Sequence, residues 1–234
     1  MIRYVLTDIE GTTTPITFVH DVLFPYSKAR LAEFVRTHAN DSRVQNCLED
    51  TKKTVHEEEG HAVSDDEATQ QLERWIQQDR KHPALKTLQG MIWRYGYESG
   101  TYTSEVYADV RPALERWKER GLGLGIYSSG SVEAQQLLFG HTPTGDMTPL
   151  FAHFFDTAVG GKRESSSYQA ILTRLSLPGS AVLFLSDVPE ELDAAEAAGM
   201  RTVQLIRPGT VASAGHQTAR DFTEVEPLLS LNPI

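Results

Sequence analysis

Two carboxylates stand two residues apart near the start of the chain, in the segment Asp8-Ile-Glu10. Residues 3–7 form a short apolar run that predicts a β-strand, so Asp8 falls at the carboxyl end of that strand. Ligands gather at this end of the strands in an open parallel sheet. Gly11 permits a sharp turn, and Thr12 begins a run of threonines that supplies hydroxyl groups. Such a pair of acids can hold a metal ion and act on a substrate bound between them.

Three later segments have the same form, an apolar run that predicts a strand and then a short polar group. These are residues 122–127 with Ser128 and Ser129, residues 154–159 with Lys162, and residues 181–185 with Asp187. The four strand ends together offer an acid pair, a hydroxyl pair, a lysine and a further acid. Magnesium-dependent phosphoryl transfer requires a carboxylate nucleophile, neutral donors for the phosphate oxygens, one cation, and acids for the metal.

The neighbours of two of these groups add detail. Ser128 and Ser129 precede a helix expected from Val132, and we expect the free amide groups of its first turn to bind an anion. Lys162 stands in a Gly-Gly-Lys-Arg loop, where Arg163 is the competing cation. The pattern therefore predicts a phosphate bound between a helix start and a lysine.

This set of motifs resembles the haloacid dehalogenase superfamily of phosphohydrolases. The resemblance matches its motifs in chain order with Asp8-Ile-Glu-Gly-Thr, with Ser128 or Ser129, with Lys162, and with Ser186-Asp187 together with Glu191. It implies an aspartyl-phosphate intermediate on Asp8 and dependence on Mg²⁺.

One departure narrows the resemblance. Most phosphatases of that superfamily carry Asp two residues after the nucleophile, whereas this chain has Glu10. The chain is similar here to the enolase-phosphatase family of the methionine salvage pathway, over residues 2 to about 207. The segments that carry this likeness are residues 8–15, 22–26, 85–90, 127–133 and 183–187.

The resemblance to that family implies a set of site roles and one Mg²⁺ per chain. The implied residues are Asp8, Glu10 and Lys162 for catalysis, Ser128, Ser129 and Lys162 for substrate binding, and Asp8, Glu10 and Asp187 for the metal. Glu191 matches the second acid of the fourth motif, which could act through a metal-bound water.

The implied substrate is a phosphorylated diketone, 2,3-diketo-5-methylthiopentyl-1-phosphate. It is enolised first and then dephosphorylated to an acireductone. Either Glu10 or a residue of a helical cap is expected to take the carbon-bound proton, and the cap is expected to contact the thioether end. The cap residues of interest are Lys86, Gln89, Trp93 and Tyr97.

The hydrophobic pattern places these motifs in an α/β fold with an insert. From residue 106 onward, predicted helices at 111–120, 132–138, 166–175 and 189–198 alternate with strands, of which 202–206 is the last. Repeated strand–helix units imply a parallel sheet with helices on both faces. We therefore expect a haloacid dehalogenase-like Rossmannoid core, formed by residues 1–15 and 106–234.

Residues 16–105 are expected to form an all-helical cap inserted after the first strand. Helical spacing replaces strand signals there, and helices are predicted at 65–75 and 84–97. Ser64 or Asp65 is a suitable N-cap. The segment 56–67 is strongly acidic and contains Gly60, so it is expected to be a loop or an exposed helix end. Its two histidines lack the spacing of a zinc-protease helix.

Composition limits the partners. A formal net charge of −10 and a pI of about 5.3 argue against nucleic acid, which is bound by basic surfaces. Cys47 is the only cysteine, which excludes an intrachain disulfide, and no secretory signal or apolar run of roughly 18 residues is visible. We expect a cytoplasmic monomer that binds neither nucleic acid nor membranes.

Two alternatives remain open. One is another capped phosphatase of the same superfamily that acts on a sugar phosphate, against which Glu10 argues. The other is a phospho-acceptor signalling module, because such modules also combine Asp, Ser or Thr, and Lys on a parallel sheet. These modules are much shorter and lack a long insert after the first strand.

Overall fold

The computed structural model describes residues 1–230. The chain divides into two compact units, the first made of Met1–Ile16 and the residues from Thr103 onward, the second of Thr17–Tyr102. Among the described residues, no helix combines the length and the apolar character needed to cross a membrane.

The first unit is built on a six-stranded parallel sheet with strand order β3-β2-β1-β4-β5-β6. The strands are β1 (Tyr4–Thr7), β2 (Gly123–Tyr127), β3 (His153–Phe155), β4 (Val182–Ser186), β5 (Arg201–Leu205) and β6 (Thr218–Ala219). Because β1 lies between β2 and β4, the chain reaches the two sides of the sheet from its centre. The carboxyl end of β1 is thus at the point where the strand order reverses, which is where ligands bind in such sheets.

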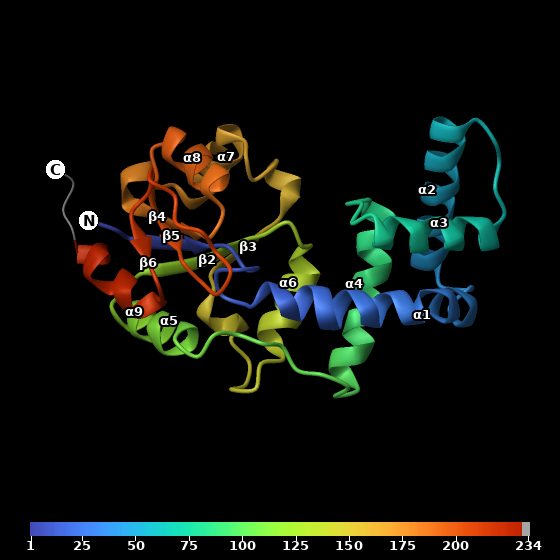
Figure 1. Ribbon diagram of the computed structural model, residues 1–234, viewed down its shortest axis with the longest axis horizontal. Helices are drawn as coiled ribbons and strands as arrows, with labels where there is room; N and C mark the ends of the chain where they lie inside the picture. Colours follow the sequence, from blue (N-terminus) through green and yellow to red (C-terminus); the bar gives the residue numbers. More distant parts are fainter. Residues whose placement is uncertain (231–234) are drawn as a thin grey trace. The chain divides into compact units, whose positions relative to one another are not determined.

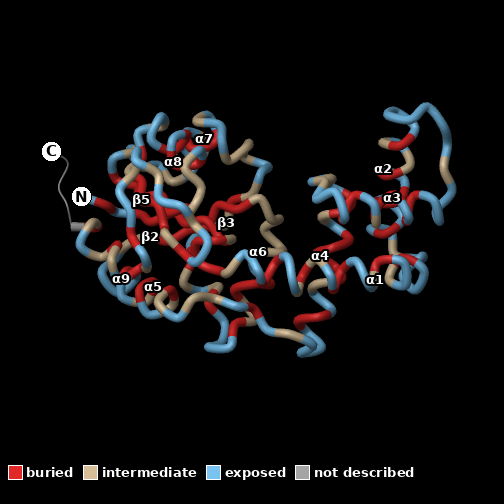
Figure 2. The backbone as a smooth tube through the Cα atoms, viewed as in Figure 1, coloured by how far each residue is buried: buried red, intermediate tan, exposed pale blue. Residues whose placement is uncertain are grey.

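Helices cover both faces of the sheet (Figure 1). One face carries α5 (Val110–Glu119), α6 (Val132–Gly140) and α9 (Phe222–Val225), and the other carries α7 (Ser165–Leu175) and α8 (Pro189–Ala197). The central strands β1 and β4 are entirely buried between them, and Figure 2 shows the buried backbone of the sheet. The prediction of an α/β fold with a parallel sheet is therefore confirmed.

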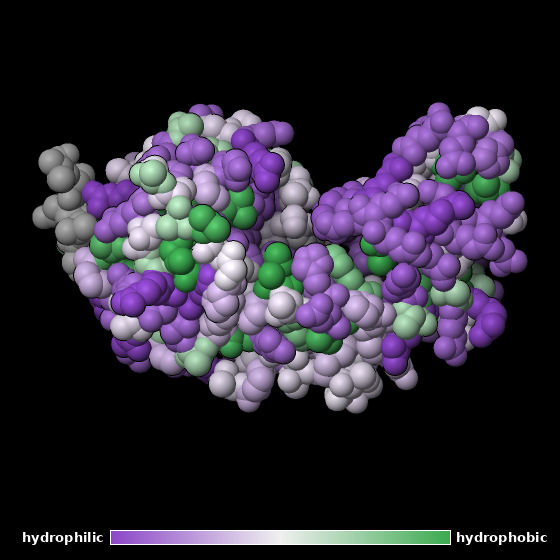
Figure 3. All heavy atoms as spheres, in the orientation of Figure 1, coloured by the Kyte–Doolittle hydropathy of each residue, from purple (hydrophilic) through white to green (hydrophobic). Residues whose placement is uncertain are grey.

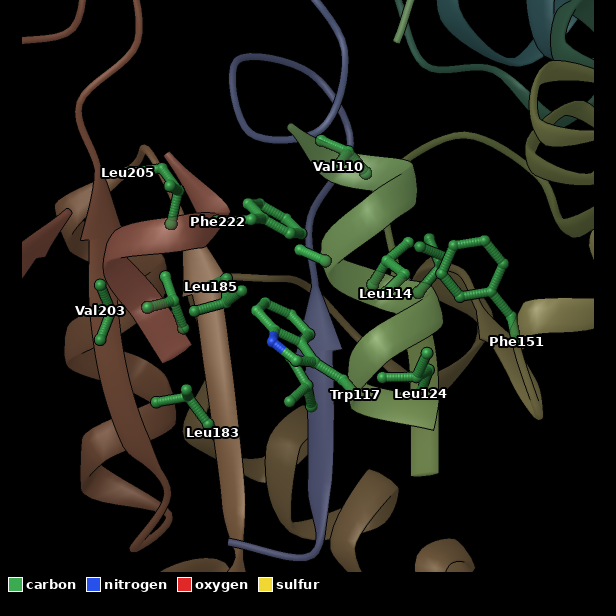
Figure 4. Packing of buried hydrophobic residues seen from close by; sticks show 14 of the residues in the cluster. Val110, Leu114, Trp117, Leu124, Phe151, Leu183, Leu185, Val203, Leu205 and Phe222 are labelled. Carbon is green, nitrogen blue, oxygen red and sulfur yellow. The ribbon is translucent and has the colours of Figure 1, made fainter. Parts of the chain in front are cut away.

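Alternation along β1 explains the two cores. Val5 packs on the face of α5 and α9, whereas Tyr4 and Leu6 pack on the face of α7 and α8. Trp117 and Phe222 stack on the first face with ring centroids 5.2 Å apart, and Figure 4 shows them between the helices and the sheet. Both rings are fully buried, which ties α9 to the sheet.

Strand register brings the predicted polar groups to one level. Thr7, the last residue of β1, pairs with Ile126 on one side and with Leu185 on the other. Asp8 is the next residue, so it lies level with Tyr127 and Ser186. Parallel register therefore collects the polar ends of β1, β2 and β4 at one edge of the sheet.

The second unit is helical. It consists of a π-helical turn (Phe18–Leu23), α1 (Phe24–Thr37), α2 (Ser42–Glu59), α3 (Asp65–Gln77) and α4 (Pro83–Glu98). Ser64 is the N-cap of α3 and forms a capping box with Glu67. The buried core of this helical unit includes Leu31, Leu72 and Leu88. The visible surface over α2 and α3 is mostly hydrophilic (Figure 3).

Two strand predictions are wrong, one in the length of the strand and one in its place as the last strand. The segment predicted at 154–159 is a strand only as far as Phe155, because the Asp156 side chain accepts a hydrogen bond from Ala158 N at 2.9 Å and the chain turns into a 3-10 helix. The segment at 202–206 is not the last strand, because the short β6 pairs with β5 beyond it.

Helix α2 was not predicted. Its buried residues Val44, Cys47, Leu48, Thr51 and Val55 recur at helical spacing, so a signal was present. The intervening residues are nearly all polar or charged, which lowered the apparent hydrophobicity of the segment.

Candidate active site

Asp8 lies at the centre of the site and pairs with Lys162. The Lys162 ammonium forms an ion pair with Asp8 Oδ1 and a second one with Glu191 Oε2 at 2.7 Å. The two side chains are nearly buried, with 10% of Lys162 and 3% of Asp8 exposed. Asp8 is therefore buried at the end of its strand, with the Lys162 ammonium against its carboxylate. Lys162, and not Arg163, is the cation that reaches Asp8.

Glu191 anchors the other side of this lysine. It lies in the first turn of α8 and accepts a hydrogen bond from Ser186 Oγ at 2.9 Å. Burial and the nearby Asp8 carboxylate raise the pKa of Glu191 to about 7, although Lys162 opposes the shift. Burial alone would lower the pKa of Lys162, but Asp8 and Glu191 outweigh it and raise that pKa, so the lysine stays charged.

Glu10 contacts the end of β2. Ser128 Oγ donates a hydrogen bond to Glu10 Oε2 at 3.2 Å, and Ser128 is fully buried. Burial and the Asp8 carboxylate raise the pKa of Glu10, which favours its protonated form. A raised pKa favours the protonated carboxyl group that general acid catalysis requires. Ser129 follows Ser128 directly and leads into α6.

Gly11 allows the Asp187 carboxylate to lie against the loop after β1. Gly11 has φ of +79°, and a Cβ atom there would lie 2.3 Å from Asp187 Oδ2. The Asp187 backbone N–H donates to Thr12 Oγ1 at 3.0 Å. A glycine is therefore required both by the backbone conformation and by the close approach of the acid.

The donor set fits a divalent cation. Asp187 Oδ1 is buried and has no hydrogen-bond partner among the described residues. Burial, then Asp8 and Glu10, raise the pKa of Asp187 to about 6, because acids are crowded here against a single lysine. Carboxylate oxygens are the ligands that Mg²⁺ prefers, and its charge would relieve this crowding.

The start of α6 differs from the prediction. The first-turn amides were expected to be free for an anion, but Val132 N donates to Asp156 Oδ2 at 3.3 Å and Ala134 N donates to Ser131 Oγ at 3.3 Å. Gly130 N donates to Ser128 Oγ at 3.1 Å. These amides therefore donate to side chains already, and one of the acceptors is Ser131, the N-cap residue of α6.

The cap residues of interest lie on α4 and form contacts inside the helical unit. Trp93 Nε1 donates to Leu23 O at 2.8 Å, and the Tyr97 ring meets the Tyr102 ring edge to face. Gln89 is buried, and its amide nitrogen lies 3.5 Å from Ser27 Oγ. Lys86 is not free either, because it also interacts with another group of the chain. Three of the four therefore stabilise the helical unit itself.

The sequence did not predict the polar contacts that support the site from a distance. Lys162, in the loop after β3, forms an ion pair with Glu191 of α8, and Arg207 Nε donates to Thr12 O from 195 positions away. The sequence carries a weak signal for Arg207 alone, as a polar residue just after a predicted strand.

This geometry defines a hydrolase site, and comparison with known proteins agrees. The chain matches the family of haloacid dehalogenase-like hydrolases over residues 2–199, so it belongs to that family. A 2-haloacid dehalogenase from Pseudomonas syringae has the same fold, with a TM-score of 0.63, 17% identity, and coverage of 98% of this chain and 99% of the other.

Within these hydrolases, the chain belongs to the enolase-phosphatase E1 family. It is 54% identical to enolase-phosphatase E1 of Sorangium cellulosum over 230 residues, which cover 96% of this chain and 97% of that protein. The crystal structure of UTR4 protein from Saccharomyces cerevisiae is similar with a TM-score of 0.78 and 36% identity, and covers 94% of this chain and 98% of the other. Phosphatases of the haloacid dehalogenase type are typically Mg²⁺-dependent.

Replacing Gly11 with alanine is expected to weaken Mg²⁺ binding and phosphate release together. The new Cβ would collide with Asp187, and the left-handed backbone would cost about 1–2 kcal/mol of folding stability. Gly121→Ala is the matched control, because Gly121 has φ of +82° with nothing within 4 Å. Metal titration and a phosphate assay test both variants, and equal effects at the two glycines would contradict the proposed contact.

Proposed function

We propose that this chain converts 2,3-diketo-5-methylthiopentyl-1-phosphate, through its enol phosphate, to the acireductone 1,2-dihydroxy-3-keto-5-methylthiopentene and phosphate. The observation that carries the proposal is Glu10, two residues after Asp8 and bonded to Ser128 at the end of β2. Membership of the enolase-phosphatase E1 family supports the same reaction and places the chain in methionine salvage.

The dephosphorylation step uses Asp8 as the nucleophile. An Asp8 carboxylate oxygen attacks phosphorus, the bond from phosphorus to the enol oxygen breaks, and Glu10 gives its proton to that leaving oxygen. Water then attacks the aspartyl-phosphate, gives a proton back to Glu10, and releases phosphate. The raised pKa of Glu10 supports this role, because the acid must hold a proton before the first step.

The surrounding groups orient the phosphate. Lys162 lies against Asp8 and offsets negative charge as the phosphate approaches, and Glu191 keeps the ammonium in place. Ser128 and Ser129 are the proposed donors to the phosphate oxygens. For an anion to use the amides at the start of α6, it must displace the Asp156 and Ser131 contacts.

One Mg²⁺ per chain is part of the proposal. Asp8, Asp187 and the backbone carbonyl of residue 10 would hold it, with the Glu10 side chain as a ligand implied by family resemblance. Bound Mg²⁺ would polarise the substrate oxygens and offset the charge of the phosphate and of an enolate. The enolisation base is Glu10 or a residue of the helical unit, which we propose closes over the site and excludes water.

The reaction is tested by two signals measured together. Ultraviolet absorbance follows enolisation, and a phosphate assay follows release, both with Mg²⁺ present. Multiple turnovers of the diketone phosphate are expected, which would exclude a phospho-acceptor module. Faster turnover of common sugar phosphates than of the diketone phosphate would instead favour the other capped phosphatases of the superfamily. Action as a monomer and a cytoplasmic location remain predictions.

Adding Mg²⁺ is expected to raise the unfolding temperature of the protein more at pH 8 than at pH 5.5. Asp187 and Glu191 have folded-state pKa values of about 6 and about 7, above their ordinary values of 3.8 and 4.5. The folded state therefore binds more protons than the unfolded state, and these groups contribute less stability as the pH rises through this range. Once Asp187 is ionised, protons no longer compete with the metal for its carboxylate.

The measurement is thermal unfolding at the two pH values, with and without Mg²⁺. Asp187→Asn is the control, because the amide removes the charge and keeps the size. The metal should then give little shift at either pH. An equal shift at pH 5.5 and pH 8 in the unmodified protein would contradict the proposed ligand set.

A further inference from the structure

Arg207 reaches from the end of β5 to the loop that follows β1. Its Nε donates to Thr12 O at 3.0 Å, and its two terminal nitrogens bind the two carboxylate oxygens of Asp109 at 2.9 and 2.8 Å. Arg207 is only 6% exposed, although it carries a charge. A buried guanidinium in a bidentate pair has a fixed orientation, because its planar donors match the carboxylate.

Asp109 is itself held in place. Besides the two bonds from Arg207, its Oδ2 accepts a hydrogen bond from Phe222 N at 2.9 Å. Arg207 also donates to Arg220 O at 3.3 Å, and its guanidinium lies over the Tyr107 ring at 4.1 Å. The pair therefore joins the start of α5 and the segment before α9 to the loop after β1. The segment after residue 207, in which the sequence shows no motif, therefore helps to hold this pair in place.

Thr12 connects the Arg207–Asp109 pair to Asp187, the proposed metal ligand. Its carbonyl accepts from Arg207, and its hydroxyl accepts from Asp187 N. On its other side, Asp187 O accepts from the buried Gln204 side chain at 3.0 Å. Gly11, next to Thr12, lies against the Asp187 carboxylate. A displacement of Thr12 would thus move the Glu10–Thr12 loop relative to Asp187.

We propose that Arg207, oriented by Asp109, is a positioning residue that fixes the Glu10–Thr12 loop against Asp187. It touches no reacting atom, and acts through the Thr12 carbonyl. Its effects on rate and on Mg²⁺ binding rest on the proposed function, whereas its effect on the hydrogen exchange of the loop does not. Loss of the guanidinium should therefore lower kcat and weaken Mg²⁺ binding, with KM little changed.

The test variant is the double substitution Arg207→Met with Asp109→Asn. Removing both charges avoids leaving one buried and unpaired, which would destabilise the fold. Asn at 109 keeps an acceptor for Phe222 N, and Met keeps an apolar contact with the Tyr107 ring. Arg116→Gln is the matched control, because Arg116 forms an exposed ion pair with Glu226 at 2.6 Å in the same unit.

Arg207→Lys is the second variant, and it carries the test if the double variant does not fold. Lysine keeps the charge, but a single ammonium cannot reproduce the planar fork that bonds both Asp109 and Thr12. Thermal unfolding first establishes that each variant is folded.

Three readouts follow: steady-state kinetics, Mg²⁺ titration by calorimetry without substrate, and hydrogen exchange of the peptide that contains residues 9–14. We expect kcat to fall by roughly 10- to 100-fold, the scale on which small displacements of catalytic groups act. We also expect weaker Mg²⁺ binding and faster exchange in the loop, with the Arg116 variant unchanged.

A folded variant with kcat, Mg²⁺ affinity and loop exchange equal to those of the control would overturn the proposal. If the unmodified protein does not turn over the diketone phosphate, the proposed function fails. The exchange measurement then still decides the role of Arg207, because it does not use substrate.

Discussion

Replacing Asp8 with asparagine is expected to abolish phosphate release and to leave the fold intact. An amide is a poor nucleophile and cannot form the acyl-phosphate, so the rate should fall by roughly 10⁴-fold or more, as when other covalent nucleophiles are removed. The side chain keeps its size in a nearly filled position, and Lys162 retains Glu191 as an ion-pair partner. The loss of one carboxylate also relieves the crowding of acids around Asp187.

Single-turnover and steady-state phosphate assays measure this effect, and thermal unfolding checks the fold. Asp146→Asn is the control for the chemical change, because Asp146 is an exposed acid that accepts from Thr148 in the same unit. Phosphate release by the Asp8 variant above a few per cent of the unmodified rate would exclude Asp8 as the nucleophile.

Replacing Glu10 with glutamine is expected to separate the two steps of the reaction. Glutamine keeps the size and an acceptor for Ser128 Oγ, but has no proton to give to the leaving oxygen. General acid–base groups contribute about 10²- to 10⁴-fold, so phosphate release should fall by at least the lower value. Enolisation should be impaired less, and a phosphorylated enol should accumulate in the ultraviolet signal.

Glu10→Asp is the matched control. It keeps an acid but is one methylene shorter, so the contact with Ser128 is lost and intermediate activity is expected. Simultaneous loss of both signals in the Gln variant would make Glu10 the enolisation base as well. Near-normal phosphate release from that variant would show that Glu10 is neither the acid nor the base. The proposed reaction would then be supported by family resemblance alone.

Local sequence was enough to predict which polar residues follow the strands and meet at one edge of the sheet. Asp8 and Glu10 follow β1 directly, Ser128 follows β2, and Asp187 follows β4. Parallel strands end at a common edge, so three strand ends at matched register bring these residues together. Lys162 was also placed at the site, although its strand ends earlier than predicted, because the loop after β3 still leads toward Asp8.

Sequence also predicted most helices, since their apolar residues recur along one face. The exceptions have local physical causes. Helix α2 has a narrow apolar face among charged residues, and Asp156 ends β3 by capping the turn that follows. At α6 the amides expected to be free donate to the side chains of Ser131 and Asp156. Ser131 is a neighbour in sequence, whereas Asp156 follows β3 and so comes from another strand end.

Sequence by itself determined which residue types stand at the ends of the strands, and so the class of chemistry. Tertiary structure alone decided what holds those residues in place: Glu191 against Lys162, Arg207 and Asp109 against Thr12, and Asp187 against Gly11. These contacts join segments far apart in the chain, and each depends on how helices and loops pack on the sheet. Strand and helix periodicities encode only which face of an element is buried, and they carry no information about such long-range polar pairs.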